Sequence, residues 1–171
     1  FSLGEIKENI TLTTNTPTKA SKEQIINKAL QFHSQDNISE AAKYYQQLIN
    51  QGCNDHRVFS NYGVILKNLG KLKEAELSYR KAIELNPDLA QAHSNLGNIL
   101  KDLGKLQEAE LSYRKAIELN PNFAKAHLNL GGVLKDLGNL QAAELSTRKA
   151  IELNPDLAEA HLNLGTTLKD L

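Results

Sequence analysis

The chain has 171 residues, and its 20 basic side chains equal its 20 acidic ones, so the formal net charge is zero. This balance disfavours nucleic acid as a partner and implies no strongly charged ligand. The single cysteine, Cys53, cannot form a disulfide within the chain, and nothing marks a secreted, disulfide-stabilised fold. No apolar run approaches the ~20 residues of a membrane-spanning helix. We therefore expect a cytoplasmic protein without membrane insertion.

Residues 1–20 form a polar leader that we expect to be extended or disordered. The stretch ITLTTNTPTKAS is rich in threonine and contains Pro17. Such a composition buries too little apolar surface to fold by itself. Because Ile10 and Leu12 alternate with threonine, a short strand or a docked peptide remains an alternative.

Beyond the leader, the sequence repeats with a period of 34 residues. Pro87, Pro121 and Pro155 mark this spacing, and residues 90–123 and 124–157 are identical at most positions. The predicted units are a degenerate one at 21–55, three clear ones at 56–89, 90–123 and 124–157, and the start of another at 158–171. A period of this length indicates stacked units that bury their apolar faces against one another.

The degenerate unit, 21–55, keeps the pattern in weakened form. It has small residues at Ala29 and Ala41 and an aromatic residue at Tyr45, but Cys53 takes the place of the proline. We expect it to adopt the same fold as the clear units.

Each clear unit is predicted to be a pair of helices. In the unit 90–123, apolar residues recur at helical spacing over 90–102 and again over 106–119. Gly104 ends the first helix, and the proline of the sequence LNP ends the second. Asp88 and Gln91 are predicted to form a reciprocal cap for the first helix, and Asp156 and Glu159 repeat this pair.

Charged residues recur on the opposite face of the second helices. Glu76, Arg80 and Glu84 are spaced four residues apart, and the next unit repeats them as Glu110, Arg114 and Glu118. Pairs at this spacing stabilise a helix by ~0.2–0.5 kcal/mol. We interpret them as a solvated convex face.

A 34-residue unit of two helices with small, large, aromatic and proline positions in this order resembles the tetratricopeptide repeat. The family pattern falls on Leu96, Gly97, Leu100, Ala109, Tyr113, Ala116 and Pro121, whereas Thr147 replaces the aromatic residue one unit later. The resemblance implies an all-α, right-handed superhelical solenoid of antiparallel helix pairs. Gly97 and Ala109 would let the two helices of a unit approach closely.

The recurring histidines are predicted to be packing residues. His93, His127 and His161 occupy equivalent positions on successive first helices. Neighbouring helices pack ~8–10 Å apart, whereas zinc ligands lie ~2.0–2.1 Å from the metal, so the three cannot share an ion. In the family, a large side chain fills this position. We expect no metal site and no cofactor.

The recurring asparagines are the main candidates for ligand binding. The row comprises Asn61, Asn95, Asn129 and Asn163. In the family this position faces the concave groove, and the row resembles the asparagine ladder of O-linked N-acetylglucosamine transferases, which holds a peptide backbone. An amide offers two donors and an acceptor to any peptide group. Alternatively, asparagine is merely tolerated on a wet surface or bonds a neighbouring helix.

Other positions of the expected groove can be assigned in the same way. They are the basic row Lys67, Lys101 and Lys135, the acidic positions Asp102 and Asp136, the amide Asn98, and the apolar pair Leu128 and Leu162. The adjacent basic and acidic rows largely cancel, whereas the leucines should make the C-terminal half of the groove apolar. Gly131 and Gly132 weaken their helix by ~1 kcal/mol each, so we expect local mobility there.

A clamp for a C-terminal carboxylate, as in chaperone-binding relatives, is not expected. Lys125 and Asn95 fit that pattern, but Asn129 stands where those relatives have arginine and Ser60 where they have lysine.

These observations predict a non-catalytic scaffold that binds a protein or extended peptide along its concave face. No phosphate-binding loop or nucleophile motif is present. One alternative is a substrate-recruiting arm of a larger glycosyltransferase, sulfotransferase or methyltransferase. Another is self-association through the helix at 158–171, where Leu164, Leu168 and Leu171 would lack a second helix. That end is expected to be capped by another molecule, to be disordered, or to continue in a longer protein.

Overall fold

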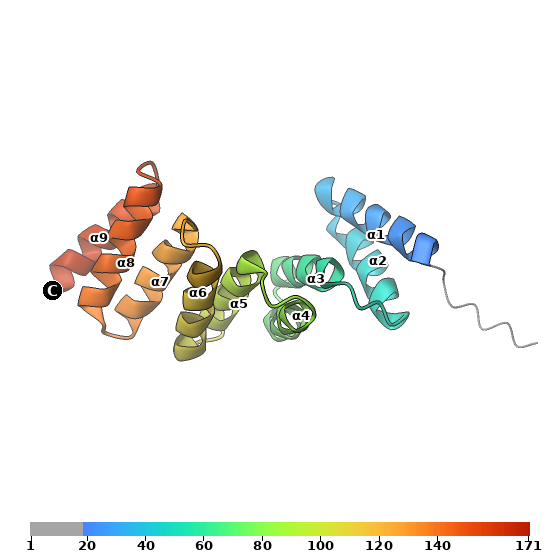
Figure 1. The fold of residues 1–171 in the computed structure, drawn as a ribbon, viewed down its shortest axis with the longest axis horizontal. Coiled ribbons are helices and arrows are strands. Elements are labelled where there is room, and N and C mark those ends of the chain that lie inside the picture. Colours follow the sequence, from blue (N-terminus) through green and yellow to red (C-terminus); the bar gives the residue numbers. More distant parts are fainter. Residues whose placement is uncertain (1–18) are drawn as a thin grey trace, which may run out of the picture.

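The computed structural model describes residues 19–171, with side chains from residue 21, and shows an all-α solenoid (Figure 1). The predicted leader lies outside the described residues apart from Lys19 and Ala20, which begin the first helix. In the described part the helices are α1 (Lys19–Ser34), α2 (Ile38–Asn50), α3 (His56–Asn68), α4 (Leu72–Leu85), α5 (Ala90–Asp102), α6 (Leu106–Leu119), α7 (Ala124–Asp136), α8 (Leu140–Leu153) and α9 (Ala158–Asp170). None of these helices has the length and apolarity needed to cross a membrane.

The helices pack as consecutive pairs along the long axis of the molecule (Figure 1). The pairs are α1 with α2, α3 with α4, α5 with α6, and α7 with α8, and α9 follows the last pair. Each second helix also packs against the first helix of the next pair. The solenoid predicted from the 34-residue period is therefore confirmed.

The turn within each clear unit is built around a glycine. Gly104 has a φ of 75°, in the left-handed region that favours glycine. The amide of Gly104 donates to the carbonyl of Lys101, and the amide of Lys105 donates to the carbonyl of Leu100. These two bonds satisfy carbonyls left open at the end of α5. The same arrangement recurs around Gly70 and Gly138.

The predicted caps at the beginning of the first helices are wrong. The N-cap of α5 is Leu89, which makes no side-chain capping bond. Asp88 lies one residue too early to cap the helix; its amide donates to Oδ1 of Asn86 at 3.2 Å. Gln91 donates to Oδ1 of Asn95. At α9, Asp156 and Glu159 form no cap either, and the amide of Asp156 donates to Oδ1 of Asn154.

The core lies between the helices of each pair and continues into the next pair. Tyr113 on α6 is fully buried, and its ring lies over Gly97 of α5. A Cβ atom at Gly97 would lie 2.7 Å from the ring carbon Cε1 of Tyr113, so the glycine makes room for the aromatic residue. In the next unit Thr147 takes the aromatic place, and its hydroxyl donates to the carbonyl of Ala143.

The degenerate unit packs in the same manner as the clear ones. Ala29, Ala41 and Tyr45 are fully buried, and Cys53 is 6% exposed in the same cluster. Burial raises the pKa of Tyr45 to about 12.

The outer charges differ partly from the predicted solvated face. Glu76 is buried, and its carboxylate accepts bonds from Arg80 and from Lys105 in the next unit. Burial by itself would raise the pKa of Glu76, but the bonds from Lys105 and Arg80 outweigh it and lower that pKa. Glu84 pairs with Lys81 rather than with Arg80. The pair formed by Arg114 and Glu110 is the predicted surface type.

Candidate peptide-binding groove

The first helices of the units lie on the inner side of the solenoid. Besides packing within and between neighbouring pairs, α5 contacts α7, and α7 contacts α9. In the described part, no second helix makes a comparable contact with the next second helix. From α5 to α9 the first helices are therefore closer to one another than the second helices are, and we call the side of the solenoid on which the first helices lie the inner face.

The asparagine row lies along this inner face, but its members differ in their bonding. Nδ2 of Asn61 donates to the carbonyl of Arg57, one turn earlier in α3. Oδ1 of Asn95 accepts from Gln91 in α5. Nδ2 of Asn129 donates across the units to Oδ1 of Asn98, at 2.9 Å. The bond to a neighbouring helix that the sequence left open as an alternative is thus present at Asn129.

Asn98 connects the inner face with the core. Its Oδ1 atom accepts a hydrogen bond from the buried hydroxyl of Tyr113 at 2.7 Å, in addition to the bond from Asn129. Burial, together with the charge of Asp102, raises the pKa of Tyr113, so the hydroxyl keeps its proton and remains a donor. One carbonyl oxygen therefore joins α5, α6 and α7.

The basic and acidic rows pair across successive units. Nζ of Lys101 lies 3.9 Å from Oδ2 of Asp136, and Nζ of Lys135 lies 3.2 Å from Oδ2 of Asp170. Lys67 and Asp102 hold the positions equivalent to Lys101 and Asp136 one unit earlier, but no ion pair joins them among the described residues. The two lysines at the C-terminal end of the basic row thus each face a carboxylate of the next unit.

The assignment of Leu128 to the groove is wrong. Leu128 is 2% exposed and packs with Ala150 and Ala160 between α7, α8 and α9. Ser94, its equivalent one unit earlier, is also 2% exposed. Leu162 holds the same position on α9 and is 67% exposed. This position lies in the contact with the following unit. The side chain there is buried where a helix of that unit packs against it, as α9 does against Leu128.

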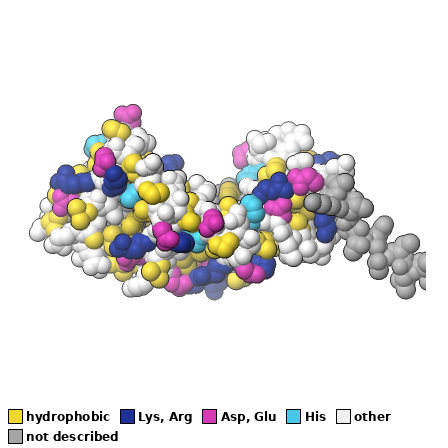
Figure 2. Space-filling view, in the orientation of Figure 1, with side chains coloured by type: hydrophobic (Ala, Val, Ile, Leu, Met, Phe, Trp, Pro, Cys, Tyr) yellow, Lys and Arg dark blue, Asp and Glu magenta, His cyan; other side chains and the backbone are white. Residues whose placement is uncertain are grey.

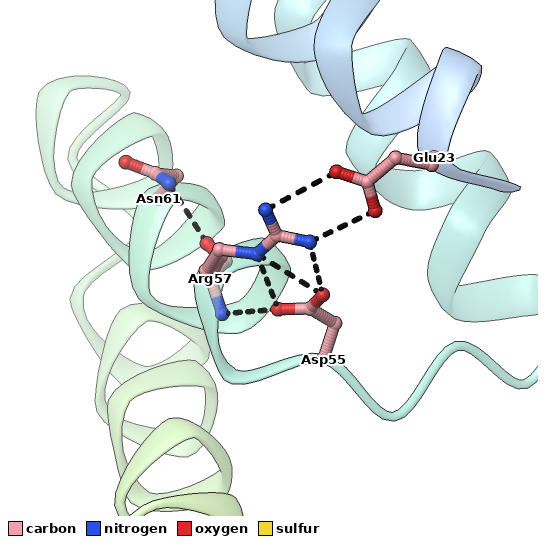
Figure 3. A network of polar contacts seen from close by, with 4 residues as sticks. All are labelled: Glu23, Asp55, Arg57 and Asn61. Carbon is pink, nitrogen blue, oxygen red and sulfur yellow. Dashed lines mark hydrogen bonds and ion pairs between the residues drawn. The ribbon is translucent and has the colours of Figure 1, made fainter.

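A charged network joins α1 to the beginning of α3 (Figure 3). Arg57 at the start of α3 binds both carboxylate oxygens of Glu23 from α1, at 3.2 and 3.0 Å, and also contacts Asp55. The bond from Arg57 to the Asp55 side chain lowers the pKa of that carboxyl group, and its bonds to Asp55 and Glu23 raise the pKa of Arg57. Asp55 also caps α3 by accepting from the amide of Arg57.

The recurring histidines contact the backbone of the proline turns between units. Nε2 of His93 lies 2.9 Å from the carbonyl oxygen of Pro87, and His127 and His161 make the same contact with Pro121 and Pro155. His93 and His127 are half-buried, whereas His161 is exposed. Each ring ties the proline turn to the following helix rather than filling the space between helices. Among the described residues no cluster of His, Cys, Asp or Glu could hold a metal ion.

The outer side carries a repeating apolar feature that sequence reasoning missed. A hollow of about 380 Å³ is lined by Ile49, Phe59 and Leu77 among others, and a second of about 430 Å³ by their equivalents Ile83, His93 and Leu111. Leu77, Leu111 and Leu145 are 67–70% exposed. The sequence signal for this feature is a leucine that recurs every 34 residues on an otherwise charged face. Elsewhere basic and acidic side chains are interspersed over the visible surface (Figure 2).

Comparison with known proteins identifies the repeat. Three family models match: "Tetratricopeptide repeat" over residues 90–123, "TPR repeat" over 63–104 and "Tetratricopeptide repeat" over 112–144. Comparison with curated protein sequences gives no match.

Among solved structures, MamA from Desulfovibrio magneticus RS-1 is similar, with 22% identity, a TM-score of 0.80, and coverage of 87% of this chain and 85% of that one. YrrB, described as a TPR protein with an unusual peptide-binding site, has 24% identity, a TM-score of 0.77, and coverage of 89% and 76%. The first TPR of Spaghetti (RPAP3), bound to an HSP90 peptide, has 25% identity, a TM-score of 0.67, and coverage of 68% and 92%. With the period and the helix pairs, these matches show that residues 63–144 consist of tetratricopeptide repeats.

Proposed function

We propose that this chain is a non-catalytic scaffold that binds an extended peptide segment of a partner protein along its inner face. The observation that carries the proposal is the row of amide side chains on successive first helices. Each amide can make more hydrogen bonds than the structure uses. Asn129 and Asn95, for example, each spend part of their capacity within the chain and keep the rest.

The spacing of the row suits an extended peptide. Neighbouring helices lie ~8–10 Å apart, and an extended strand rises ~3.3 Å per residue. One asparagine would therefore meet the backbone at roughly every third peptide residue. An amide recognises backbone groups without reading side chains, so this contact supplies affinity over a range of sequences.

The charges of the inner face favour a ligand of low net charge. Lys101 and Lys135 are paired with Asp136 and Asp170, so a strongly anionic peptide would have to displace those partners. The similar structures support a peptide ligand in general terms, because YrrB is described as having a peptide-binding site and the Spaghetti TPR holds an HSP90 peptide.

The test uses a peptide that the purified chain selects from a random peptide library displayed on phage. Its affinity would be measured by fluorescence anisotropy for the native protein and for the double variant Asn95→Ala, Asn129→Ala. Losing two hydrogen bonds of ~1 kcal/mol each should weaken binding by about 30-fold. Helicity, followed by circular dichroism, should stay the same.

The matched control is Asn139→Ala. Asn139 is exposed at the N-cap of α8 and makes no capping bond there, so its loss should leave the affinity unchanged. Equal affinity of the native protein and the double variant would contradict binding through the asparagine row. A selection that returns no peptide would contradict the proposed function itself.

Self-association is a second candidate, favoured by the apolar face of α9. Leu168 and Leu171 are 46% and 51% exposed, whereas Leu134, the equivalent of Leu168, is 2% exposed beneath α8. Light scattering at increasing concentration should show a rising mass for the native chain and a constant monomer mass for Leu168→Glu. A constant monomer mass for both would exclude this candidate.

A further inference from the structure

The outer face, the side on which the second helices lie, carries ion pairs that join α4 to α6. Nζ of Lys105, the N-cap residue of α6, lies 2.9 Å from Oε2 of Glu76 on α4. One turn further along, Nη2 of Arg80 on α4 lies 2.6 Å from Oε2 of Glu108 on α6. An acid and a base on one second helix thus pair with a base and an acid on the next. The junctions on either side of this one each hold half of the set.

The junction between α2 and α4 keeps only the half that belongs to α4. Lys71 and Glu74 hold the positions equivalent to the base and the acid of α6. On α2, however, Ala42 and Gln46 stand where α4 has its acid and its base. Both charged residues are exposed, and neither forms an ion pair with any residue that the structure describes. This junction therefore lacks an acid and a base spaced four residues apart.

The junction between α6 and α8 keeps the opposite half. Glu110 and Arg114 on α6 are an acid and a base spaced four residues apart. The positions that face them on α8 hold Asn139 and Ala142, which carry no charge. Nε of Arg114 lies 2.8 Å from Oε1 of Glu110, and in the described part of the chain this pair within one helix is the ion pair that either residue makes. The two incomplete junctions are thus complementary to each other.

The apolar features of the outer face follow the same division. The hollow of about 380 Å³ lies at the junction between α2 and α4, where Ile49, Phe59 and Leu77 line it together with the unpaired lysine and glutamate of α4. Leu111 lies on the helix that presents the acid and the base, and it is 67% exposed. One junction therefore offers a cavity with two open charges, and the other helix offers a projecting leucine between the two charges that would complete it.

We propose that the outer face binds a second copy of this chain, with α6 of one copy lying over the hollow between α2 and α4 of the other. Leu111 then enters the hollow. Glu110 faces Lys71 of the other copy, and one turn further along Arg114 faces Glu74, so both contacts join opposite charges when the helices run parallel. Exposed ion pairs add little affinity, but complementary charges fix the orientation in which two surfaces meet.

A two-fold axis parallel to the second helices makes this contact reciprocal. Exposed leucines and hollows alternate along the outer face with one period, so the same operation brings Leu77 of each copy to the hollow of about 430 Å³ between α4 and α6 of the other. Leu145, one unit further along, lies beyond the contact. The zero net charge of the chain adds no overall repulsion between copies. Both inner faces stay open, so the inference does not depend on peptide binding.

The area involved suits a reversible dimer. The helices α2, α4 and α6 have 13, 14 and 14 residues. At ~20 Å in length and ~10 Å in width each, they present a face of roughly 600 Å². A standard interface buries about 800 Å² on each partner, and transient pairs bury less. We therefore expect a dissociation constant above about 1 μM.

The experiment is sedimentation equilibrium of the native chain from about 1 μM to about 1 mM, the range in which a transient dimer dissociates. The mass should rise from one chain to two. Leu111→Glu should weaken dimerisation about 100-fold, because each buried leucine contributes about tenfold and the dimer loses two. The matched control is Leu145→Glu, which changes an equally exposed leucine of the next second helix and should leave the dimer intact.

Charge reversal tests the orientation of the two copies. Glu74→Arg disturbs no ion pair within the described chain, but it places two positive charges opposite each other in the dimer and should weaken it about tenfold. Arg114→Glu should weaken the dimer in the same way. The double variant Glu74→Arg, Arg114→Glu restores opposite charges across the contact, so its dimerisation should recover. A double variant that dimerises no better than the single ones would overturn the proposed pairing.

The remaining outcomes are equally decisive. A mass of one chain at every concentration would overturn the inference, and so would equal weakening by Leu111→Glu and Leu145→Glu. Loss of the dimer in Leu168→Glu, with Leu111→Glu unaffected, would assign self-association to α9 instead. Circular dichroism should show native helicity for each variant, because the substituted side chains project from the helix surface. None of these results bears on the affinity for a peptide, so the proposed function is tested separately.

Discussion

Replacing Gly132 with alanine should stabilise the protein, because this glycine weakens α7 without serving the packing. Gly132 lies inside α7, which runs unbroken from Ala124 to Asp136. A Cβ atom built there would meet only Nζ of Lys101, at 3.5 Å, an ordinary van der Waals distance. The expected mobility around Gly131 and Gly132 stays a prediction, and this substitution addresses its cause.

The size of the gain follows from helix propensity. Glycine in a helix interior is ~0.8–1.0 kcal/mol less favourable than alanine, chiefly because its unfolded backbone is freer. Because the Cβ atom added at position 132 clashes with no other atom, the full gain in unfolding free energy is expected. In a chain of this length ~1 kcal/mol corresponds to a rise in Tm of ~2–4 °C.

Urea unfolding followed by circular dichroism at 222 nm would measure the effect as a higher midpoint at constant slope. The control is Gly97→Ala, where the added Cβ would lie 2.7 Å from the buried ring of Tyr113. Overpacking of this kind costs ~1–3 kcal/mol. The same substitution should therefore act with opposite sign at the two glycines. A lower or unchanged midpoint for Gly132→Ala would refute the reasoning.

Three further predictions concern buried groups. Tyr45→Phe should raise the free energy of unfolding by ~1 kcal/mol, because the buried hydroxyl of Tyr45 has no partner, whereas Tyr113→Phe should lower it by a similar amount by breaking the bond to Asn98; equal effects in urea unfolding would contradict this. Leu128→Ala should cost ~2–5 kcal/mol and Leu162→Ala should be nearly neutral, because the first is 2% and the second 67% exposed; similar midpoints would place Leu128 in the groove after all. The lowered pKa of Glu76 stabilises the fold above the ordinary carboxyl pKa of ~4.3, and this contribution is lost as pH falls through the folded-state pKa. Glu76→Gln should therefore reduce the decrease in unfolding free energy between neutral and acidic pH by no more than ~1 kcal/mol. The same decrease in the native protein and the variant would argue against the role of this carboxylate.

The comparison of Leu128 with Leu162 shows what a repeat leaves open. The two residues are equivalent by the 34-residue period, yet one is buried and the other exposed. Their surroundings depend on whether another helix pair follows, which no local pattern contains. Glu76 and Glu110 differ for a similar reason, because Lys105 faces the first and Asn139 stands at the equivalent position for the second.

The positions of the helices and the type of repeat unit could be predicted from the sequence, because turns at glycine and proline and the 3.6-residue periodicity depend on only a few neighbouring residues. The predicted helices at 90–102 and 106–119 coincide with α5 and α6. Only the tertiary structure decided how the polar side chains pair. The Asn98 carbonyl is joined to Tyr113 and Asn129, 15 and 31 residues away, and hydrogen bonds over that separation depend on how whole helices pack. The sequence alone thus located the asparagine row, and helix packing determined which of its atoms are bonded within the chain.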